Sequence, residues 1–169
     1  PYTGLPIPAQ AEIVIEGEMS TEYLEVEGPF GEYTGYMGMG GPGLFFDVTC
    51  ITHRKQPIWN AFLSQFPPSE SSTLRGVGSD AGLYKFLKHD LSIHNLVDAS
   101  SHRNSGSVQF CVLSLKNATS ADVWKALKGA DALHVAGGKM IVAVDDDIDV
   151  RDLDSVIWAR LDMRASSDS

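Results

Sequence analysis

The sequence is poor in cysteine, in long apolar runs and in basic residues, and each shortage excludes a class of protein. Only two cysteines occur among 169 residues, Cys50 and Cys111, so neither a disulfide framework nor a CxxC metal knuckle is present. No stretch approaches the roughly 18 consecutive apolar residues of a membrane helix, and residues 1–6 lack the basic-then-apolar pattern of a secretory signal. We therefore expect a cytoplasmic protein whose two cysteines are unreactive core residues.

Basic residues are outnumbered by acidic ones, 13 against 22, which gives a formal net charge of -9 and a pI of about 4.8. Such a field repels phosphate backbones, so nucleic acid is not an expected partner. The five histidines show neither HxxxH nor HExxH spacing, and no serine lies in a GxSxG elbow, which argues against zinc and serine hydrolases. The glycine-rich run Gly38–Gly43 lacks the Lys-Ser/Thr of a P-loop, so it predicts a hairpin loop.

The first part of the chain is β-rich, within a composition of 43% hydrophobic residues that is typical of a packed globular protein. Residues 11–17 are rich in β-branched side chains and end in glycine, which predicts a strand and then a turn. Seven glycines and two prolines between Gly28 and Gly43 exclude a helix there. Residues 44–52 predict a long strand that is buried over most of its length.

From about residue 73 the hydrophobic period becomes helical. Ser79 is predicted to cap one helix, and Thr119 or Ser120 the next. Helices and strands are then expected to alternate: apolar stripes Leu83–Leu91, Val123–Leu127 and Leu153–Leu161, and strands 93–97, 108–115 and 140–144. Trp59, Trp124 and Trp158 are interpreted as core anchors. This order predicts an α+β chain in two parts, residues 1–70 and an α/β layer domain at 71–169.

The segment with the clearest chemical potential is Glu27-Gly28-Pro29-Phe30-Gly31-Glu32. Proline and glycine in its middle predict a turn that brings the two carboxylates to one site. Paired carboxylates in a partly apolar pocket can have their pKa values pushed apart, so that one acts as acid and the other as base. The alternative is that Glu27 and Glu32 are solvated charges beside a surface turn.

Several separate segments resemble the UbiD decarboxylase family in order and spacing: Ile7–Gly17, Glu27–Glu32, Tyr33–Tyr36, Asp145–Asp149 and Asp154–Ala159. The resemblance implies that residues 1–70 are part of a split β-barrel catalytic domain and that 71–169 are most of its C-terminal domain. It implies reversible, non-oxidative decarboxylation of an aromatic or α,β-unsaturated carboxylic acid. Glu32 would be the proton donor, and Glu27 its partner in an Arg-Glu-Glu network.

The same resemblance implies prenylated FMN as cofactor, supplied by a flavin prenyltransferase, together with a divalent metal, Mn or Mg, and a homo-oligomeric enzyme. The catalytic Arg, and the Asn, His and Glu that hold the metal, would lie N-terminal to the matched part. We therefore expect the isolated chain neither to bind the cofactor tightly nor to turn over. The alternative is a catalytically silent assembly module or subunit, which a start codon close to Pro1 would support.

Two further features have open interpretations. Arg75 falls at a position that lines the substrate pocket in the family, where its planar fork could hold a second carboxylate of the substrate. Alternatively it is an exposed arginine at the start of a helical region. The acidic run Asp145–Asp149 could be a Mg²⁺ or Ca²⁺ site, but a strand end followed by a capped helix start explains it more simply.

Overall fold

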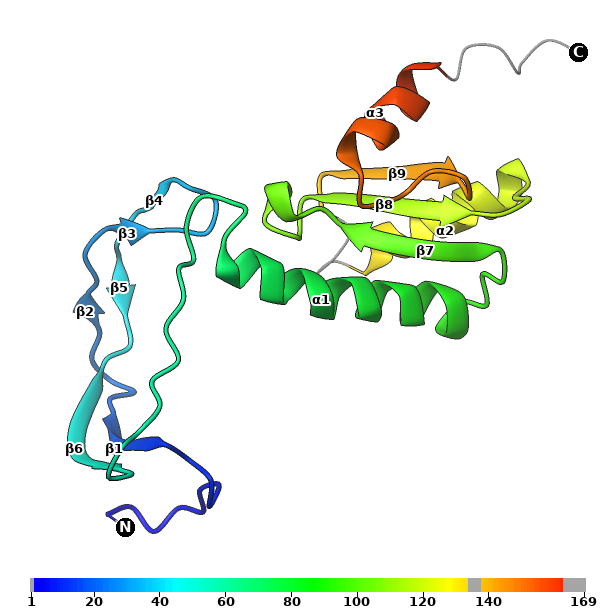
Figure 1. Ribbon diagram of the computed structural model, residues 1–169. Coiled ribbons are helices and arrows are strands. Elements are labelled where there is room, and N and C mark those ends of the chain that lie inside the picture. Colours follow the sequence, from blue (N-terminus) through cyan, green and yellow to red (C-terminus); the bar gives the residue numbers. More distant parts are fainter. Residues whose placement is uncertain (1, 134–137, 163–169) are drawn as a thin grey trace, which may run out of the picture. The chain divides into compact units, whose positions relative to one another are not determined.

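The computed structural model describes residues 2–133 and 138–162 of the chain. It divides into two compact units (Figure 1): Pro1–Glu32 with Met37–Phe62, and Tyr33–Tyr36 with Leu63–Ser169. Within the described ranges, no helix is both long enough and apolar enough to cross a membrane. Each unit is best understood from its own strands and helices.

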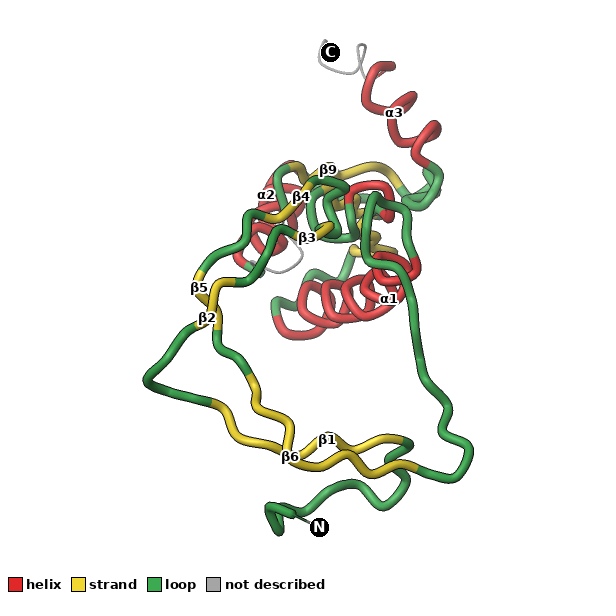
Figure 2. The backbone as a smooth tube through the Cα atoms, turned by 90° about the vertical axis from the view of Figure 1, so that its left-hand side faces the viewer, coloured by secondary structure: helices red, strands yellow, loops and turns green. Residues whose placement is uncertain are grey.

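The first unit is built on one long, interrupted antiparallel hairpin. Its strands pair in nested order, which Figures 1 and 2 show as a two-stranded ribbon: β1 (Ile13–Met19) with β6 (Phe46–His53), β2 (Glu25–Val26) with β5 (Pro42–Gly43), and β3 (Phe30–Gly31) with β4 (Met37–Gly38). Because the pairs are nested, residues 33–36 form the tip, which we call the hairpin tip. The predicted first strand is therefore confirmed, but the turn predicted after Gly17 is wrong, because β1 continues to Met19. Gly38–Gly43 is not a hairpin loop but part of one arm.

Two glycines let the arms of this hairpin approach each other. A Cβ atom on Gly17 would overlap the carbonyl oxygen of Asp47, next to the β-bulge at Glu16 and Gly17. A Cβ atom on Gly40 would overlap the carbonyl oxygen of Glu27. The high glycine content of this part of the sequence thus reflects close backbone contact as well as turns.

The prediction that the strand at 44–52 is buried is wrong. In β6 six of eight residues are exposed, and Val48 and Ile51 each expose more than half of their surface. The reason is that, among the described residues, β6 pairs with β1 alone, and a two-stranded ribbon buries few side chains by itself. Cys50, predicted to be a core thiol, is accordingly only half-buried.

The second unit is a three-stranded sheet covered by helices. Its strands lie in the order β7 (Leu96–Ser101), β8 (Phe110–Leu115), β9 (Met140–Asp145), with β7–β8 antiparallel and β8–β9 parallel. Its helices are α1 (Glu70–Lys85), which continues into the π-helical turn η1 (Phe86–Asp90), the 3-10 turn η2 (Arg103–Ser105), α2 (Ser120–Ala132) and α3 (Leu153–Asp162). Helix α2 makes the crossover between the two parallel strands, as such a connection requires.

Alternate residues of the central strand separate two apolar clusters. Leu113 belongs to a cluster with Leu83, Leu87 and other residues of the α1, η1 and α2 region. Val112, its neighbour in β8, packs instead with Val156 of α3. Because successive strand residues face opposite sides, the sheet has helical cover on both faces, and the predicted α+β class is confirmed.

Helix α1 begins at Glu70, nine residues before the predicted cap at Ser79, which lies inside it. The actual cap is Ser69, whose side chain accepts from the Ser72 backbone N–H at 3.3 Å, while the Ser69 backbone N–H donates to the Ser72 hydroxyl at 2.7 Å. Glycines within the first turns lower the intrinsic helix propensity there, but Gly76 is buried, where a Cβ would lie 3.0 Å from the Ser107 hydroxyl. Tertiary packing therefore outweighs the local penalty.

The remaining helices and strands agree with the sequence in type and differ in detail. Thr119 caps α2, and the strands at 108–115 and 140–144 are confirmed. The strand predicted at 93–97 instead occupies 96–101. The three tryptophans are 69%, 62% and 60% exposed, so the prediction that they anchor the core is wrong. The domain boundary at residue 70 stays a prediction, and the end of the second part, 163–169, lies outside the described residues.

Candidate functional site

Glu27 and Glu32 each follow a short strand of the long hairpin. Glu27 comes directly after β2, and its backbone N–H donates to the Gly41 carbonyl at 2.9 Å across the hairpin. Glu32 comes directly after β3. The turn predicted between the two glutamates is wrong, because the extended strand β3 lies between them and the turn follows Glu32. Glu27 is exposed and Glu32 is half-buried, and a shared site for their carboxylates stays a prediction.

Tyr33, the residue after Glu32, contacts two elements of the second unit. The Arg75 guanidinium carbon lies 4.7 Å from the centroid of the Tyr33 ring, a cation–π distance. Arg75 Nη1 also donates to the carbonyl oxygen of Gly106 at 3.5 Å. A Cβ atom on Gly106 would lie 3.0 Å from Tyr33 Cδ2, so the backbone at Gly106 passes close to the same ring. Tyr33 thus contacts both α1 and the turn after η2.

Arg75 is thus held by contacts within the protein. It is half-buried in the second turn of α1, and its planar group is stacked on Tyr33. The interpretation of Arg75 as an exposed arginine is thus wrong. Its contact with a substrate stays a prediction.

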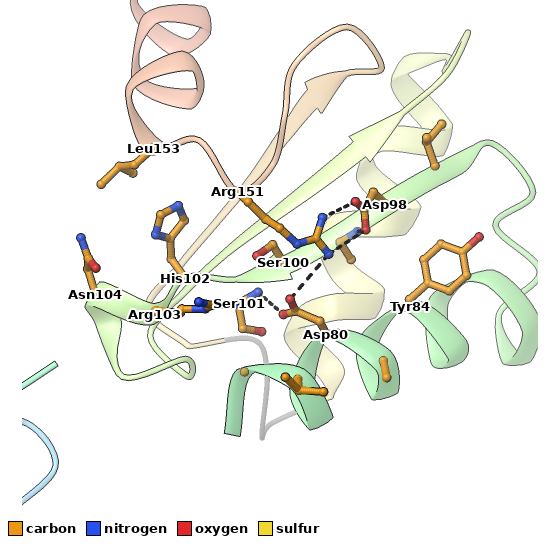
Figure 3. A pocket seen from close by; sticks show the side chains of 15 residues that line it. Asp80, Tyr84, Asp98, Ser100, Ser101, His102, Arg103, Asn104, Arg151 and Leu153 are labelled. Carbon is orange, nitrogen blue, oxygen red and sulfur yellow. Dashed lines mark hydrogen bonds and ion pairs between the residues drawn. The ribbon is translucent and has the colours of Figure 1, made fainter. Parts of the chain in front are cut away.

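A cleft of about 890 Å³ lies elsewhere in the second unit, along the free edge of strand β7. Figure 3 shows Arg151 between two aspartates in this cleft. Arg151 Nη1 donates to Asp98 Oδ2 at 2.5 Å, and Arg151 Nη2 lies 3.8 Å from Asp80 Oδ2. Asp80 Oδ1 in turn accepts from the Ser101 backbone N–H at 2.5 Å. Burial raises the pKa of Asp80 above its ordinary value, and the hydrogen bond from Ser101 opposes that shift.

This charged network binds backbone N–H groups at the edge of the sheet. Asp98 Oδ1 accepts from the Ala99 backbone N–H at 2.8 Å, and Asp80 accepts from that of Ser101, so two N–H groups of the edge strand are already occupied. Occupied donors make a strand edge a poor template for a further strand. The Ser101 hydroxyl and His102 Nε2 have no hydrogen-bond partner among the described residues, but both atoms are shut off from solvent and so from a ligand in the cleft. We interpret the network as structural.

The acidic run Asp145–Asp149 is a strand end followed by a helix start, as the simpler interpretation predicted. Strand β9 ends at Asp145, and Asp146 pairs with Lys116 at 2.9 Å. Asp149 Oδ1 accepts from the Arg151 backbone N–H at 2.8 Å in the turn that leads to α3. Among the residues that the structure describes, no group of three or more His, Cys, Asp or Glu side chains could hold a metal ion. The carboxylates here bind backbone and lysine instead.

The fold and the hairpin define a class: an α+β chain in which a glutamate-bearing hairpin precedes a helix-covered sheet. Two family models match, the 3-octaprenyl-4-hydroxybenzoate carboxy-lyase Rift-related domain at residues 1–66 and the 3-octaprenyl-4-hydroxybenzoate carboxy-lyase C-terminal domain at 72–165. The chain belongs to the UbiD family, as the resemblance in the sequence implied. Both glutamates lie in the first matched range and Arg75 in the second.

A sequence relative and two solved structures are consistent with this family. A protein of Archaeoglobus fulgidus, itself uncharacterised, is 33% identical over 92% of this chain and 32% of its own. An evolved dimeric form of the UbiD-class enzyme HmfF from Pelotomaculum thermopropionicum, in complex with prFMN, is 30% identical with a TM-score of 0.80, over 92% of this chain and 35% of that one. Klebsiella pneumoniae 3,4-dihydroxybenzoic acid decarboxylase is 28% identical with a TM-score of 0.71, over 89% and 32%. The chain thus spans about a third of the length of these relatives.

Sequence reasoning predicted the glutamates and Arg75 as site residues, which stays a prediction, but it missed Tyr33 as the partner of Arg75, and Gly106 beside it. The two contacts join residues 42 and 73 positions apart, at spacings that no helical or strand period connects. The only signal in the sequence was indirect, since Tyr33 begins one of the segments that resemble the family.

Proposed function

We propose that this chain carries the proton-donating glutamate of a decarboxylase that acts on an aromatic or α,β-unsaturated carboxylic acid with prenylated FMN. Glu32 is the donor and Glu27 its partner. Membership of the UbiD family carries the proposal, because both glutamates lie in the range that matches the Rift-related domain of the family. A relative of the same fold in complex with prFMN, and another that decarboxylates 3,4-dihydroxybenzoic acid, support the cofactor and the substrate class.

The task of Glu32 follows from the overall reaction. The bond between the substrate carbon and its carboxylate breaks, CO₂ leaves, and a proton takes its place on the same carbon. Prenylated FMN, when bound, supplies the electron sink that makes this bond cleavage possible. Glu32 donates the proton to the carbon and recovers one from solvent, which its half-buried position allows.

The described residues supply only part of the cofactor site. Glu27 and Glu32 are the side chains that fit beside the reacting carbon, whereas no described cluster of carboxylates and histidines fits a divalent metal ion. Because the chain spans about a third of the length of its relatives, we propose that the Mn or Mg ligands, and most contacts to the flavin, lie in parts of the enzyme outside this chain. The isolated chain is accordingly expected to be inactive.

Arg75 bears on which substrate the enzyme binds. Its guanidinium stacks on Tyr33 with one face and uses one N–H toward Gly106, while an arginine carries five N–H donors in a fork. The same group could grip a second carboxylate or an acidic hydroxyl of the substrate in a bidentate manner. If Arg75 binds substrate in this way, we propose a substrate with two polar groups; an Arg75 that only holds Tyr33 carries no such requirement.

The proposal also covers assembly. One relative was solved as a dimeric form, and we propose that the enzyme containing this chain is a homo-oligomer that receives its cofactor from a flavin prenyltransferase. The second candidate is a silent assembly module. The coding sequence separates the two, because an upstream Asn, Arg, His and Glu set is needed for the enzyme, and a start codon next to Pro1 would favour the module.

The decisive experiment uses the polypeptide that carries these residues together with the upstream region of its relatives, expressed with a flavin prenyltransferase. Release of CO₂ is measured on a panel of aromatic and acrylic acids. Glu32→Gln and Glu27→Gln should each lower kcat by about 100-fold or more, the usual worth of a positioned acid. Glu25→Gln is the matched control, since Glu25 is an exposed glutamate of the same hairpin, and it should leave kcat unchanged.

Decarboxylation by Glu32→Gln at the wild-type rate would show that another group donates the proton. Absence of activity and of flavin absorbance in the wild-type protein would favour the assembly module.

A further inference from the structure

The hairpin tip belongs to a different unit from the strands that lead into it. Residues 33–36 group with the second unit, whereas β3 before them and β4 after them group with the first. Glu32, the proposed proton donor, directly precedes the hairpin tip in the chain.

Tyr33 is held by two different elements of the second unit. From α1, Arg75 places its cation 4.7 Å from the ring centroid. From the turn after η2, Gly106 brings its backbone against the ring edge, with a φ of 71° that a residue with a side chain rarely adopts. The hydrogen bond from Arg75 to the Gly106 carbonyl ties these two elements to each other. We call Arg75 and Gly106 together the Tyr33 seat.

A second contact holds the tip two residues further on. Gly35 has a φ of 89°, and Phe66 covers it so closely that a Cβ atom on Gly35 would overlap the phenyl ring. No other residue type fits this position without moving the ring or straining the backbone. The tip thus has contacts at both Tyr33 and Gly35, although Phe66 is itself 75% exposed and Tyr36 79% exposed.

We propose that Tyr33 is a positioning residue for Glu32 and that the Tyr33 seat sets where the Glu32 carboxyl stands. This inference rests on the proposed function and adds to it how the donor is held. Glu32 is joined to a residue whose ring is fixed, so few backbone conformations remain open to it. Proton transfer to carbon requires the donor within hydrogen-bond reach of one atom, and a displacement of about 1 Å can cost about 100-fold in rate.

The seat gives Arg75 a role that differs from binding substrate, and kinetics separates the two. If Arg75 acts through Tyr33, removal of either residue lowers kcat with little change in KM. The double variant should then be no worse than the worse single variant, because both changes release the same ring. If Arg75 instead grips the substrate, its removal raises KM for substrates with a second polar group and adds to the effect of removing Tyr33.

The test uses the same holoenzyme with Tyr33→Phe, Tyr33→Leu, Arg75→Met and the double variant Tyr33→Leu/Arg75→Met. Tyr33→Phe keeps the aromatic face on which the Arg75 guanidinium lies and should keep more of kcat than Tyr33→Leu. Tyr33→Leu and Arg75→Met should each lower kcat by about 10- to 100-fold, and the double variant by no more. Tyr23→Leu is the control, because Tyr23 is 69% exposed in the first unit.

A measurement that does not depend on activity tests the Tyr33 seat separately from the proposed function. Amide hydrogen exchange of residues 32–36 should be faster in Tyr33→Leu and Arg75→Met than in wild type and in Tyr33→Phe, with no change in β8. Unchanged exchange in either variant, or additive loss of kcat in the double variant, overturns the seat. If exchange is faster in Tyr33→Leu and Arg75→Met but the wild-type protein itself never decarboxylates, only the proposed function is overturned.

Discussion

Removal of the Asp80 side chain should destabilise the second unit because it leaves a buried donor without a partner. Asp80 on α1 accepts the Ser101 backbone N–H at 2.5 Å, and Ser101 is 2% exposed. A buried N–H that loses its acceptor costs about 1–3 kcal/mol. Asp80→Ala should therefore lower the free energy of unfolding by that amount.

Asp80→Asn is the matched variant, because it removes the negative charge and keeps a hydrogen-bond acceptor. An asparagine carbonyl can still accept from Ser101, while the pairing lost with Arg151, at 3.8 Å on a partly exposed guanidinium, is worth about 0–1 kcal/mol. Loss of the charge also removes the burial cost that raises the pKa of Asp80. We therefore expect Asp80→Asn to unfold within about 1 kcal/mol of wild type.

The raised pKa also sets a pH dependence. A carboxyl whose pKa is higher in the folded than in the unfolded protein favours folding in its protonated form, so its contribution is present at low pH and is lost as the pH rises through the folded pKa. Wild type should accordingly gain stability relative to Asp80→Asn as the pH falls from 7 toward 4.

The assay is urea unfolding followed by near-ultraviolet circular dichroism, with hydrogen exchange of the Ser101 amide as a local probe. Equal losses in Asp80→Ala and Asp80→Asn would show that charge rather than the acceptor matters. An unchanged free energy of unfolding in Asp80→Ala would show that the Ser101 N–H finds another partner. The interpretation that this network satisfies the edge N–H groups of β7 would then be refuted.

Three further predictions concern the second unit. Leu113→Ala, at a fully buried position of the central strand, should cost about 2–5 kcal/mol in urea unfolding, and a smaller loss would contradict the tight packing of that cluster. Ser69→Ala removes the α1 cap and should cost about 1 kcal/mol, whereas Ser79→Ala, inside the helix, should cost little. Burial raises the pKa of Cys111 to about 12, so a thiol reagent at pH 8 should label half-buried Cys50 in the native chain and reach Cys111 only on unfolding.

Local patterns predicted the elements whose partners lie nearby in sequence. The cap at Thr119 needs only Asp122, whose backbone N–H donates to it at 3.3 Å, and the strand at 140–144 follows from one apolar run. The start of α1 was misplaced because the reciprocal Ser69–Ser72 cap competes with several glycines, and the packing of Gly76 against Ser107 is invisible in the local sequence. The burial of β6 was overestimated because an apolar run does not reveal whether anything covers it.

By itself the sequence determined the family and the α+β class, because short motifs and hydrophobic periods are properties of neighbouring residues. It also supplied the two glutamates as candidates, and their roles stay a proposal. Tertiary structure alone decided that β3 separates the glutamates, that Tyr33 lies on Arg75 and Gly106, and that Asp80 serves the edge of β7. Each of these contacts, apart from β3, joins residues more than 20 positions apart. Such pairs meet only when helices and strands pack, so their roles follow from the fold rather than from spacing along the chain.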